Sequence, residues 1–482
     1  MASAQEHGKH NAVFRAYDIR GVADRDLDDD FVTDVGRALG TLLRRGGGDT
    51  LVVGRDCRTH SPRLHAALLR GLVSTGAHVI DVGIVPSPVL YFAVHHLFPP
   101  GRGSGVEITG SHNPARDNGF KIWLHGGSLH GDRLRALLPQ ISAADFVTGT
   151  GSVRAVDVRP DYEQFVRDRL RLGPRRPSVV VDAGNGTGGE IAVPLLRSLG
   201  FAVTPILCEM DGRFPHHPPD PTVPDHLQAL IAAVQGTGAE LGLAFDGDAD
   251  RLAVVDSGGR ILWGDDLLIL LGRAILREQP GATFVCEVKC SRAVVSELEA
   301  AGGRVVIWRV GHSEIREKMG QVQAALGGEM SGHLFFAHRY LGYDDAIYAA
   351  ARLLEILSWD DRTHALSRLY DTLPRLHRTS EIRRPVPDAH KQAAVRAVAD
   401  ALGRMPGVEL NDLDGVRALF PDAWALVRAS NTEPVIGLRF EATSADRLQA
   451  VRAQVEAILD GILAQLADPQ TQPAREPGQV DP

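Results

Sequence analysis

Short apolar runs recur in the same order along the first three quarters of the chain. Three similar units run over 51–80, 179–203 and 283–306. In each, an apolar run leads into a polar loop, a stretch with helical spacing, a glycine and a second apolar run. Strand–helix–strand units of this kind build parallel sheets with helical crossovers. The pattern therefore predicts three similar mixed α/β domains.

The last part of the chain is organised differently. A short strand precedes a helical stretch at 389–402, a cluster of short strands at 416–440 and a final helix. This order predicts a smaller α+β C-terminal domain. The predicted divisions are domains at 11–150, 155–256, 257–368 and 375–466, followed by a proline-rich, disordered tail at 467–482.

Composition and charge narrow the class of protein. The 482 residues are 44% hydrophobic and carry a net charge of −8, which excludes a generally basic nucleic-acid-binding surface. Four cysteines are too few for a disulfide framework and lack paired CxxC spacing, so we expect reduced thiols. The polar N-terminus does not resemble a signal peptide, and the longest apolar stretch, 267–276, is too short to span a bilayer. We therefore expect a cytoplasmic, multidomain protein that binds neither nucleic acid nor membrane.

Three carboxylates stand at alternate positions between two apolar runs. Asp246, Asp248 and Asp250 follow one run and precede the next. Their mutual repulsion is relieved by a hard divalent cation bound through oxygen. An EF-hand is excluded, because Arg251 and Ser257 stand where that loop needs glycine and glutamate. Few carboxylates combined with a phosphate favour Mg²⁺ over Ca²⁺.

The segment Thr109-Gly110-Ser111-His112-Asn113-Pro114 follows the apolar-leaning Val106-Glu107-Ile108. Its small residues allow close approach of a ligand, and Pro114 can open a following helix. Ser111 would then lie near a positive helix end, which suits a phosphorylated side chain. An ordinary Ser/Asn turn is the alternative.

A glycine-rich segment, 184–189, formally satisfies the dinucleotide pattern G-x-G-x-x-G, and Glu209 lies about twenty residues later. This keeps a dinucleotide-dependent oxidoreductase as an alternative from another class. Asp182 before the glycines and Glu190 after them would repel a pyrophosphate, so a tight strand-to-helix turn is favoured.

Two further polar segments suit recognition of a sugar phosphate. Glu329 and Ser331, at alternate positions between glycines, would point the same way in an extended loop and could grip vicinal hydroxyls. The segment 428–434 combines an arginine with hydroxyls, an amide and turn N–H groups, which suit a phosphate. Exposed polar loops without ligands are the alternative for both.

Taken together, these segments resemble the α-D-phosphohexomutase family, closest to its bacterial phosphomannomutase/phosphoglucomutase branch. The match runs nearly end to end, and His60, where the family often has serine, is a modest departure. Further matching segments are 14–21, 54–56, 118–121, 211–215, 287–291, 311–313 and 343–345. The resemblance implies four domains around a central cleft, with one functional loop from each.

The resemblance also implies roles for individual residues. Ser111 matches the phosphoserine, and the Mg²⁺ ligands are Ser111, Asp246, Asp248 and Asp250. Residues that bind phosphate or assist proton transfer are Arg20, Lys121, Arg251, Lys289, His312 and His333. Substrate-binding residues are Tyr17, Glu329, Ser331, Arg428, Ser430, Asn431 and Thr432. The general base is left open between Lys121, His333 and Arg20.

The implied reaction interconverts hexose 1-phosphate and hexose 6-phosphate through a phosphoserine enzyme and a hexose 1,6-bisphosphate, which also serves as activator. Met330 resembles the mannose/glucose branch, and phosphoglucosamine mutase is the alternative. A non-catalytic sugar-phosphate sensor is disfavoured by the intact chemical loops. The expected partners are sugar phosphates only, and the oligomeric state is left open between monomer and dimer.

Overall fold

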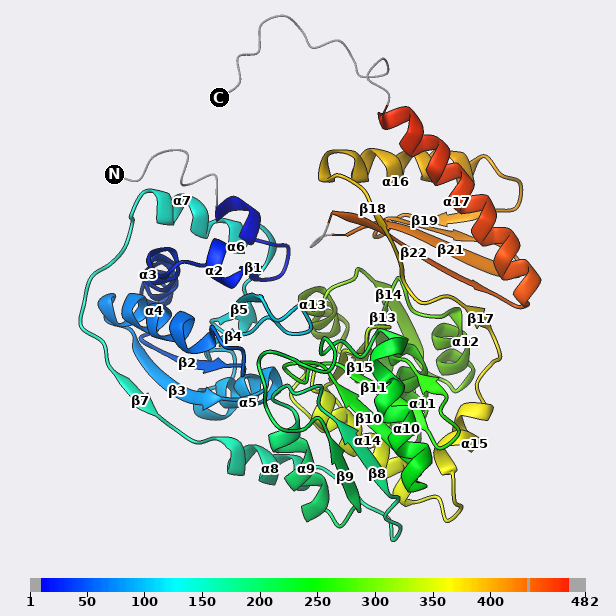
Figure 1. Ribbon diagram of the computed structural model, residues 1–482, viewed down its shortest axis with the longest axis horizontal. Helices are drawn as coiled ribbons and strands as arrows, with labels where there is room; N and C mark the ends of the chain where they lie inside the picture. Colours follow the sequence, from blue (N-terminus) through cyan, green and yellow to red (C-terminus); the bar gives the residue numbers. More distant parts are fainter. Residues whose placement is uncertain (1–9, 431–433, 468–482) are drawn as a thin grey trace, which may run out of the picture. The chain divides into compact units, whose positions relative to one another are not determined.

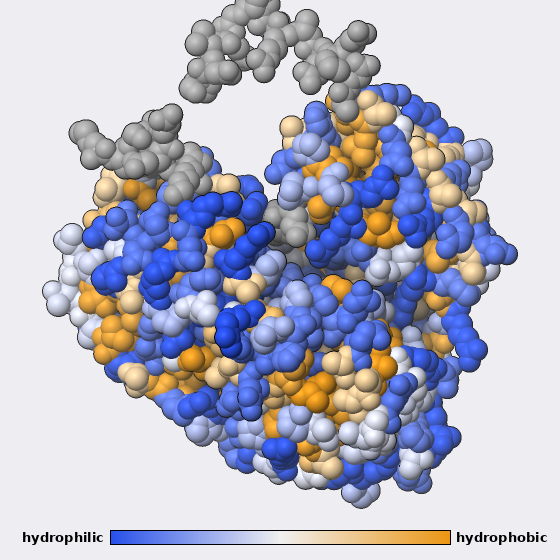
Figure 2. Space-filling view, in the orientation of Figure 1, coloured by the Kyte–Doolittle hydropathy of each residue, from blue (hydrophilic) through white to orange (hydrophobic). Residues whose placement is uncertain are grey.

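The computed structural model describes residues 10–430 and 434–467. The chain divides into two compact units (Figure 1), the first made of Met1–Ile307 and Gly311–Leu373 and the second of Trp308–Val310 and Pro374–Pro482. The visible surface is mainly hydrophilic (Figure 2). Within the described ranges, no helix is long and apolar enough to cross a membrane.

The first sheet is mixed and carries helices on both faces. Its strands follow the order β1 (Ile19–Val22), β5 (Asp117–Leu124), β4 (Gly105–Ile108), β2 (Thr50–Arg55), β3 (His78–Ile84) and β7 (Val153–Ala155), and β6 (Gly127–Ser128) pairs with β5. Its helices are η1 (Asn11–Val13), α2 (Ala23–Asp26), α3 (Asp29–Arg45), α4 (Ser61–Ser74), α5 (Ser87–Leu97), α6 (Gly131–Arg135) and α7 (Leu137–Ser142). Because side chains of a strand alternate between faces, Leu51 and Val53 join the core beneath α3 and α4, whereas Gly54 faces Leu90 of α5.

The second sheet repeats the strand–helix–strand pattern. Its order is β12 (Ile261–Leu262), β11 (Leu252–Asp256), β10 (Leu241–Phe245), β8 (Val179–Asp182) and β9 (Val203–Ile206). Strands β10, β8 and β9 are parallel, and β10 forms an antiparallel hairpin with β11. The accompanying helices are α8 (Arg159–Arg167), α9 (Gly189–Ser198), η2 (Pro224–Leu227) and α10 (Gln228–Thr237).

The third sheet has four strands. Their order is β14 (Arg304–Trp308), β13 (Thr283–Glu287), β15 (Leu326–Gly328) and β16 (Leu334–Phe336). Strands β13 and β15 are parallel, and β16 returns antiparallel to β15. The helices of this region are α11 (Gly264–Glu278), α12 (Arg292–Ala300), α13 (His312–Val322), α14 (Ala346–Ser358) and α15 (Ala365–Asp371).

The fourth sheet belongs to the second unit and is antiparallel in its described pairings. Its order is β17 (His377–Arg378), β22 (Val435–Ala442), β21 (Ala423–Ala429), β20 (Val416–Leu419) and β19 (Glu409–Asn411), and β18 (Ile382–Pro385) also pairs with β22. Its core packs beneath α16 (Asp388–Gly403) and α17 (Ala445–Ala467). The fold class predicted from the sequence, three mixed α/β sheets and a smaller α+β part, is confirmed.

A half-buried arginine joins the first and third sheets. Arg316 of α13 lies with its guanidinium carbon 3.3 Å from the ring centroid of Trp123, and the rings of Tyr91 and Tyr343 flank it at 5.3 and 5.6 Å. Its Nη2 lies 3.4 Å from Nε2 of His95 in α5. Because a guanidinium only donates hydrogen bonds, His95 accepts here and must be neutral.

This contact makes stability sensitive to acid. Burial and, to a smaller extent, the Arg316 charge together lower the pKa of His95 to about 4. Between pH 6.5 and 4.5 the unfolded chain therefore binds a proton that the folded chain does not, so stability falls as pH falls. His95→Gln retains a hydrogen-bond acceptor but does not titrate. Between pH 6.5 and 4.5 we expect its free energy of unfolding to fall by about 1 to 2 kcal/mol less than that of wild type. Urea midpoints at the two pH values measure the difference, and equal losses would contradict the assignment.

Candidate active site

The chemical loops follow the carboxyl ends of neighbouring strands. The serine loop (109–114) follows β4, the glycine loop (184–189) follows β8, and the aspartate loop (246–251) follows β10. In the third sheet, Lys289 follows β13 and Glu329 follows β15. Ligands of open α/β sheets bind at such strand ends, and direct contacts bring these loops together in the first unit.

The three predicted aspartates form one buried cluster. Asp246, Asp248 and Asp250 are each 0% exposed, and their ligand oxygens lie within 4.8 Å of one another. Oδ1 of Asp246 accepts the backbone N–H groups of Asp250 and Arg251 at 3.0 and 3.1 Å, which fixes the turn of the loop. The sequence pattern of alternate carboxylates thus corresponds to a compact set of oxygen donors.

Lysine 121 supplies positive charge to this cluster. Its Nζ donates to Oδ2 of Asp248 at 2.6 Å and to Oδ2 of Asp250. Burial alone would lower the pKa of Lys121, but Asp248 and Asp250 raise it well above its ordinary value, so the ammonium stays charged. Burial raises the pKa of Asp246, and repulsion by Asp250 and Asp248 raises it further.

The donor set fits a hard divalent cation. Oδ1 of Asp248 and Oδ1 of Asp250 are buried and receive no hydrogen bond from the described residues. Three buried carboxylates that offer only oxygen are the ligands that Mg²⁺ prefers. The inference that the aspartates can hold such a cation therefore rests on these two carboxylate oxygens, which receive no hydrogen bond from the described residues, as well as on residue type.

Ser111 lies directly against the aspartates. Its hydroxyl donates to Oδ2 of Asp246 at 2.9 Å, and the residue is only 3% exposed. Its backbone has a φ of 48°, a left-handed conformation that is rare for a residue with a side chain. The backbone N–H of Ser111 donates to the hydroxyl of Thr109 at 2.8 Å, which supports this turn.

The prediction that Pro114 opens a helix is wrong. The chain turns after Pro114, the backbone N–H of Asp117 donates to its carbonyl at 2.9 Å, and β5 begins at Asp117. The residues after this turn pair with β4 as strand β5 and therefore do not form a helix. A helix end does reach the site, but it belongs to α5, whose first residue Ser87 donates its hydroxyl to Oδ2 of Asp248 at 2.5 Å.

The serine loop is held by an arginine that the sequence analysis did not identify. The side chain of Arg58 is fully buried and lies 3.2 Å from the carboxylate of Asp56. Its guanidinium donates, at 2.6–2.9 Å, to the backbone carbonyls of Ser111, Asn113, Pro114 and Asp117. The position of Arg58 in the segment 56–58, directly after β2, was the only hint in the sequence. The partners of Arg58 are backbone atoms, which a motif of side chains does not reveal.

The glycine-rich segment 184–189 supports the aspartate loop. A Cβ at Gly186 would lie 2.5 Å from the carbonyl oxygen of Gly247, and one at Gly188 would lie 2.9 Å from Cβ of Ala249. Thr187 donates its backbone N–H to Gly247 at 3.0 Å. The glycines therefore serve close packing of two loops and a strand-to-helix turn into α9, which favours that prediction over a dinucleotide site.

Glu329 and Ser331 point toward one another. The Ser331 hydroxyl donates to Oε2 of Glu329 at 3.0 Å, and the backbone N–H of Gly311 donates to Oε1 at 2.7 Å. Burial by itself raises the pKa of Glu329, but His333 and Lys289 lower it below its ordinary value. An ionised carboxylate beside a hydroxyl can accept and donate hydrogen bonds to neighbouring sugar hydroxyls.

His333 joins the second and third sheets. Nε of Arg251 donates to Nε2 of His333 at 2.9 Å, and the two residues also form a backbone bridge. On the other side of the ring, Nδ1 lies 2.8 Å from Oδ2 of Asp344. Because the arginine Nε only donates, Nε2 is the acceptor in this contact. Burial lowers the pKa of His333, but Asp250 and Asp344 raise it above its ordinary value.

Lys289 is oriented by a second residue to which we assigned no role from the sequence. Glu287, fully buried at the end of β13, accepts the backbone N–H of Lys289 and, at 3.1 Å, that of Met330. Burial raises the pKa of Glu287 to about 7. One carboxyl group thus ties Lys289 to the loop that carries Glu329.

Tyr17, Arg20 and His312 lie nearby. The rings of Tyr17 and His312 meet edge to face with centroids 5.9 Å apart. Gly311 has a φ of 129°, and a Cβ there would lie 2.4 Å from the Tyr17 ring, so only glycine fits. Burial lowers the pKa of His312 to about 4, which leaves it neutral at pH 7. Arg20 donates to Asp18 at 2.6 Å and to Asn113 of the serine loop at 2.9 Å.

The predicted phosphate-binding residues belong to the second unit. Arg428 is 7% exposed, and its Nε donates to Oδ2 of Asp414 at 2.8 Å. Nζ of Lys391 donates to the carbonyl of Ser430 at 2.7 Å, which brings a second cation to this loop. Asn431 and Thr432, also predicted, lie outside the described residues.

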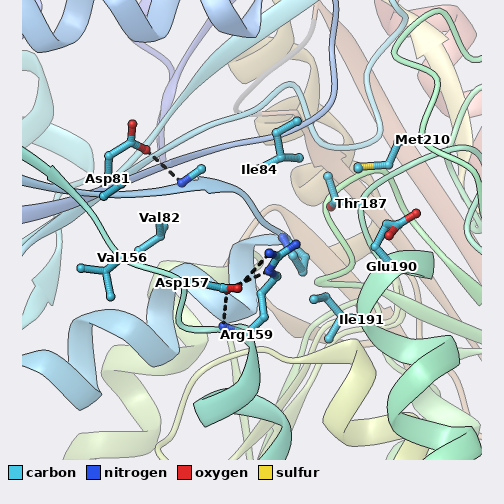
Figure 3. A pocket seen from close by; sticks show the side chains of 13 residues that line it. Asp81, Val82, Ile84, Val156, Asp157, Arg159, Thr187, Glu190, Ile191 and Met210 are labelled. Atoms are coloured by element: carbon cyan, nitrogen blue, oxygen red, sulfur yellow. Dashed lines mark hydrogen bonds and ion pairs between the residues drawn. The ribbon is translucent and has the colours of Figure 1, made fainter.

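A separate cavity of about 470 Å³ lies away from the predicted site residues (Figure 3). Residues of β3 line one side, and Thr187, Glu190 and Ile191 line the other. Among its charged groups, Arg159 binds Asp157, and Asp81 accepts the backbone N–H of Gly83. No residue to which the sequence analysis gave a catalytic, substrate-binding or metal-binding role lines it, although Thr187 and Glu190 belong to the glycine-rich segment and its flank.

Removing the support of the serine loop should loosen it. Arg58→Met would remove the side-chain hydrogen bonds to four carbonyls and leave Asp56 buried without its cation, so we expect a loss of about 3 to 5 kcal/mol. Arg58→Lys should be intermediate, because an ammonium cannot reproduce the guanidinium fork. Urea unfolding and proteolysis within 111–117 measure the effect. Arg63→Met, on the more exposed face of α4, is the matched control; equal stability of both methionine variants would refute the role of Arg58.

Models of one family match nearly the whole described chain. The description Phosphoglucomutase/phosphomannomutase is shared by all four: alpha/beta/alpha domain I matches residues 11–148, domain II residues 161–259, domain III residues 263–376 and the C-terminal domain residues 381–458.

Individual proteins of known name are also similar to this chain over nearly its whole length. A Pseudomonas aeruginosa protein named phosphomannomutase/phosphoglucomutase is 44% identical over 452 residues, covering 94% of this chain and 96% of its own. A Neisseria gonorrhoeae phosphoglucomutase is 40% identical, with 93% and 96% covered. The crystal structure of a Burkholderia thailandensis phosphoglucomutase/phosphomannomutase family protein is 40% identical, covers 94% of this chain and 97% of its own, and superimposes with a TM-score of 0.86. The family predicted from the sequence is confirmed: the chain belongs to the phosphoglucomutase/phosphomannomutase family.

Proposed function

We propose that this enzyme interconverts hexose 1-phosphate and hexose 6-phosphate, with mannose and glucose as the sugars. The observation that carries the proposal is the hydrogen bond from Ser111 to Asp246, at 2.9 Å, inside a buried cluster of three aspartates. A serine hydroxyl placed on a group of metal-binding oxygens suits phosphoryl transfer, in which positioning and charge stabilisation dominate catalysis.

Ser111 carries the transferable phosphoryl group. In the first half-reaction the bond between phosphorus and the Ser111 oxygen breaks, and a bond forms between phosphorus and the free hydroxyl of the hexose monophosphate. Of the candidates drawn from the sequence for the group that takes the hydroxyl proton, Lys121 stays charged beside Asp248 and Asp250, and the guanidinium of Arg20 has no acceptor atom. We therefore assign this proton to His333, whose Nε2 accepts a hydrogen bond. The resulting hexose 1,6-bisphosphate reorients and returns its other phosphate to Ser111, so a trace of bisphosphate also activates unphosphorylated enzyme.

Asp246, Asp248, Asp250 and Ser111 would hold Mg²⁺. When bound, the cation offsets negative charge on the transferred phosphoryl group. Lys289 and Arg251 add positive charge from neighbouring strand ends, in the manner of electrostatic stabilisation in phosphoryl transfer. Glu287 keeps Lys289 in place through its backbone N–H.

We assign recognition of the substrate to two further groups. Glu329 and Ser331 bind sugar hydroxyls, and Tyr17 and His312 lie close to them. The non-reacting phosphate is assigned to Arg428, Ser430, Asn431 and Thr432. We also retain the division into domains at 11–150, 155–256, 257–368 and 375–466 as our proposal.

Ser111→Ala tests the central role. We expect loss of nearly all turnover of glucose 1-phosphate and mannose 1-phosphate, in a coupled assay primed with glucose 1,6-bisphosphate, because no phosphoryl carrier remains. The fold should persist, since no large core side chain is lost. Ser152→Ala, at an exposed serine, is the control. Near-normal activity of Ser111→Ala with normal thermal stability would refute the phosphoserine.

Sugar specificity tests the mannose and glucose assignment. Reorientation must present similar groups to Glu329 and Ser331 in both directions, and the 3- and 4-hydroxyls do so better than the 2-hydroxyl. Inverting C2 therefore leaves no binding group unpaired, and the large penalty for such a mismatch is absent. We expect kcat/KM for glucose 1-phosphate and mannose 1-phosphate to differ by less than about a thousandfold. A strong preference for glucosamine 1-phosphate would instead support the phosphoglucosamine mutase alternative.

A further inference from the structure

A buried carboxyl group near the site has no partner and no role in the reaction above. Glu107, in the middle of β4, is 0% exposed, and neither of its carboxylate oxygens has a hydrogen-bond partner among the described residues. Burial raises the pKa of Glu107 well above its ordinary value, as expected where no cation touches the group. A buried acid without a partner destabilises the fold, so this position calls for a functional explanation.

Glu107 lies directly across the sheet from Lys121. The two residues are paired in register between β4 and β5. Side chains in such pairs share one face of the sheet, with Cβ atoms about 4.5 to 5.5 Å apart. On the other neighbouring strand stands Gly54, where a Cβ would lie 2.5 Å from Oε2 of Glu107. Glycine at that position thus gives the carboxyl group its space.

Lys121 occupies oxygens that a metal ion needs. Its ammonium binds Oδ2 of Asp248 and Oδ2 of Asp250, two of the three carboxylates in the cluster. A divalent cation on these carboxylates would repel an ammonium at hydrogen-bond distance. Lys121 therefore needs a second position when the metal ion binds, and a flexible four-carbon side chain can provide the movement.

We propose that Glu107 is the second binding position of the Lys121 ammonium, used when a divalent cation occupies the aspartates. Glu107 is then a positioning residue: it acts through Lys121 and makes metal binding easier by accepting the displaced cation. Here the inference rests on the metal site of the proposed function. It adds an exchange of partners, with the ammonium moving from Asp248 and Asp250 to a carboxyl group on the adjacent strand.

Calorimetric titration with Mg²⁺ tests this exchange without measuring activity. Wild type, Glu107→Gln and Glu107→Met are compared at equal Ser111 phosphorylation, checked by intact mass. We expect both variants to bind Mg²⁺ at least about tenfold more weakly, while Glu107→Met melts at the same or a higher temperature because an unpaired acid has been removed. A merely structural role would instead lower the melting temperature and leave Mg²⁺ affinity unchanged. Asp81→Asn, in β3 of the same sheet, is the control.

A double variant at positions 107 and 121 tests whether Glu107 acts through Lys121. With Lys121→Met as background no ammonium has to move, so adding Glu107→Gln should change Mg²⁺ affinity by less than about threefold. A tenfold effect that persists without Lys121 would overturn the proposal. Should Lys121→Met fail to fold, a crystal structure of wild type soaked in Mn²⁺ decides. Lys121 within hydrogen-bond distance of Glu107 supports the exchange, and Lys121 retained on the aspartates refutes it.

The two proposals fail in different ways. If wild type binds neither Mg²⁺ nor Mn²⁺ at the aspartates, the proposed metal site fails and the exchange fails with it. If wild type binds Mg²⁺ and the Glu107 variants bind it equally well, only the exchange is overturned, and the phosphoserine reaction is unaffected.

Discussion

Three carboxylates without exposed surface need positive charge around them, and the first unit is organised to supply it. Two like charges about 4 Å apart repel by about 4 kcal/mol at an effective dielectric of 20. The positive groups come from separate elements: Lys121 from β5, the N-terminal end of α5 through Ser87, and two backbone N–H groups on Asp246. Because these elements converge only in the folded chain, the fold and the charge balance of the site depend on each other.

Close approach of backbones is the second requirement. Gly186 and Gly188 let the glycine loop touch the aspartate loop, and Gly311 lets the third sheet reach Tyr17. These contacts let loops from different sheets meet without intervening side chains. The glycine motif resembles a dinucleotide fingerprint for a physical reason, since both uses require a tight strand-to-helix turn with little steric bulk.

Much of the fold and of the site follows from the sequence, because the relevant signals are local. The repeated strand–helix–strand pattern predicts the sheets, and the alternate aspartates predict the cluster because their neighbours in sequence are also their neighbours in space. Arg58 and Glu287 are not predictable in this way, since they bind backbone groups of distant segments. The helix expected after Pro114 fails because a local start signal carries no information about the pairing of β5 with β4. Glu107 lies between apolar residues in the sequence, and its proposed role depends on Lys121, which only the pairing of β4 with β5 places opposite it.

The left-handed backbone of Ser111 has a consequence for the reversibility of the reaction. Arg58 holds four carbonyls of the surrounding loop, so Ser111, the nucleophile of our proposal, occupies its strained position before any substrate arrives. A preset loop needs no rearrangement at the moment of transfer, and it presents the same geometry when giving and when receiving phosphate. In the proposed reaction, the forward and backward half-reactions therefore use one and the same geometry of the loop that carries Ser111.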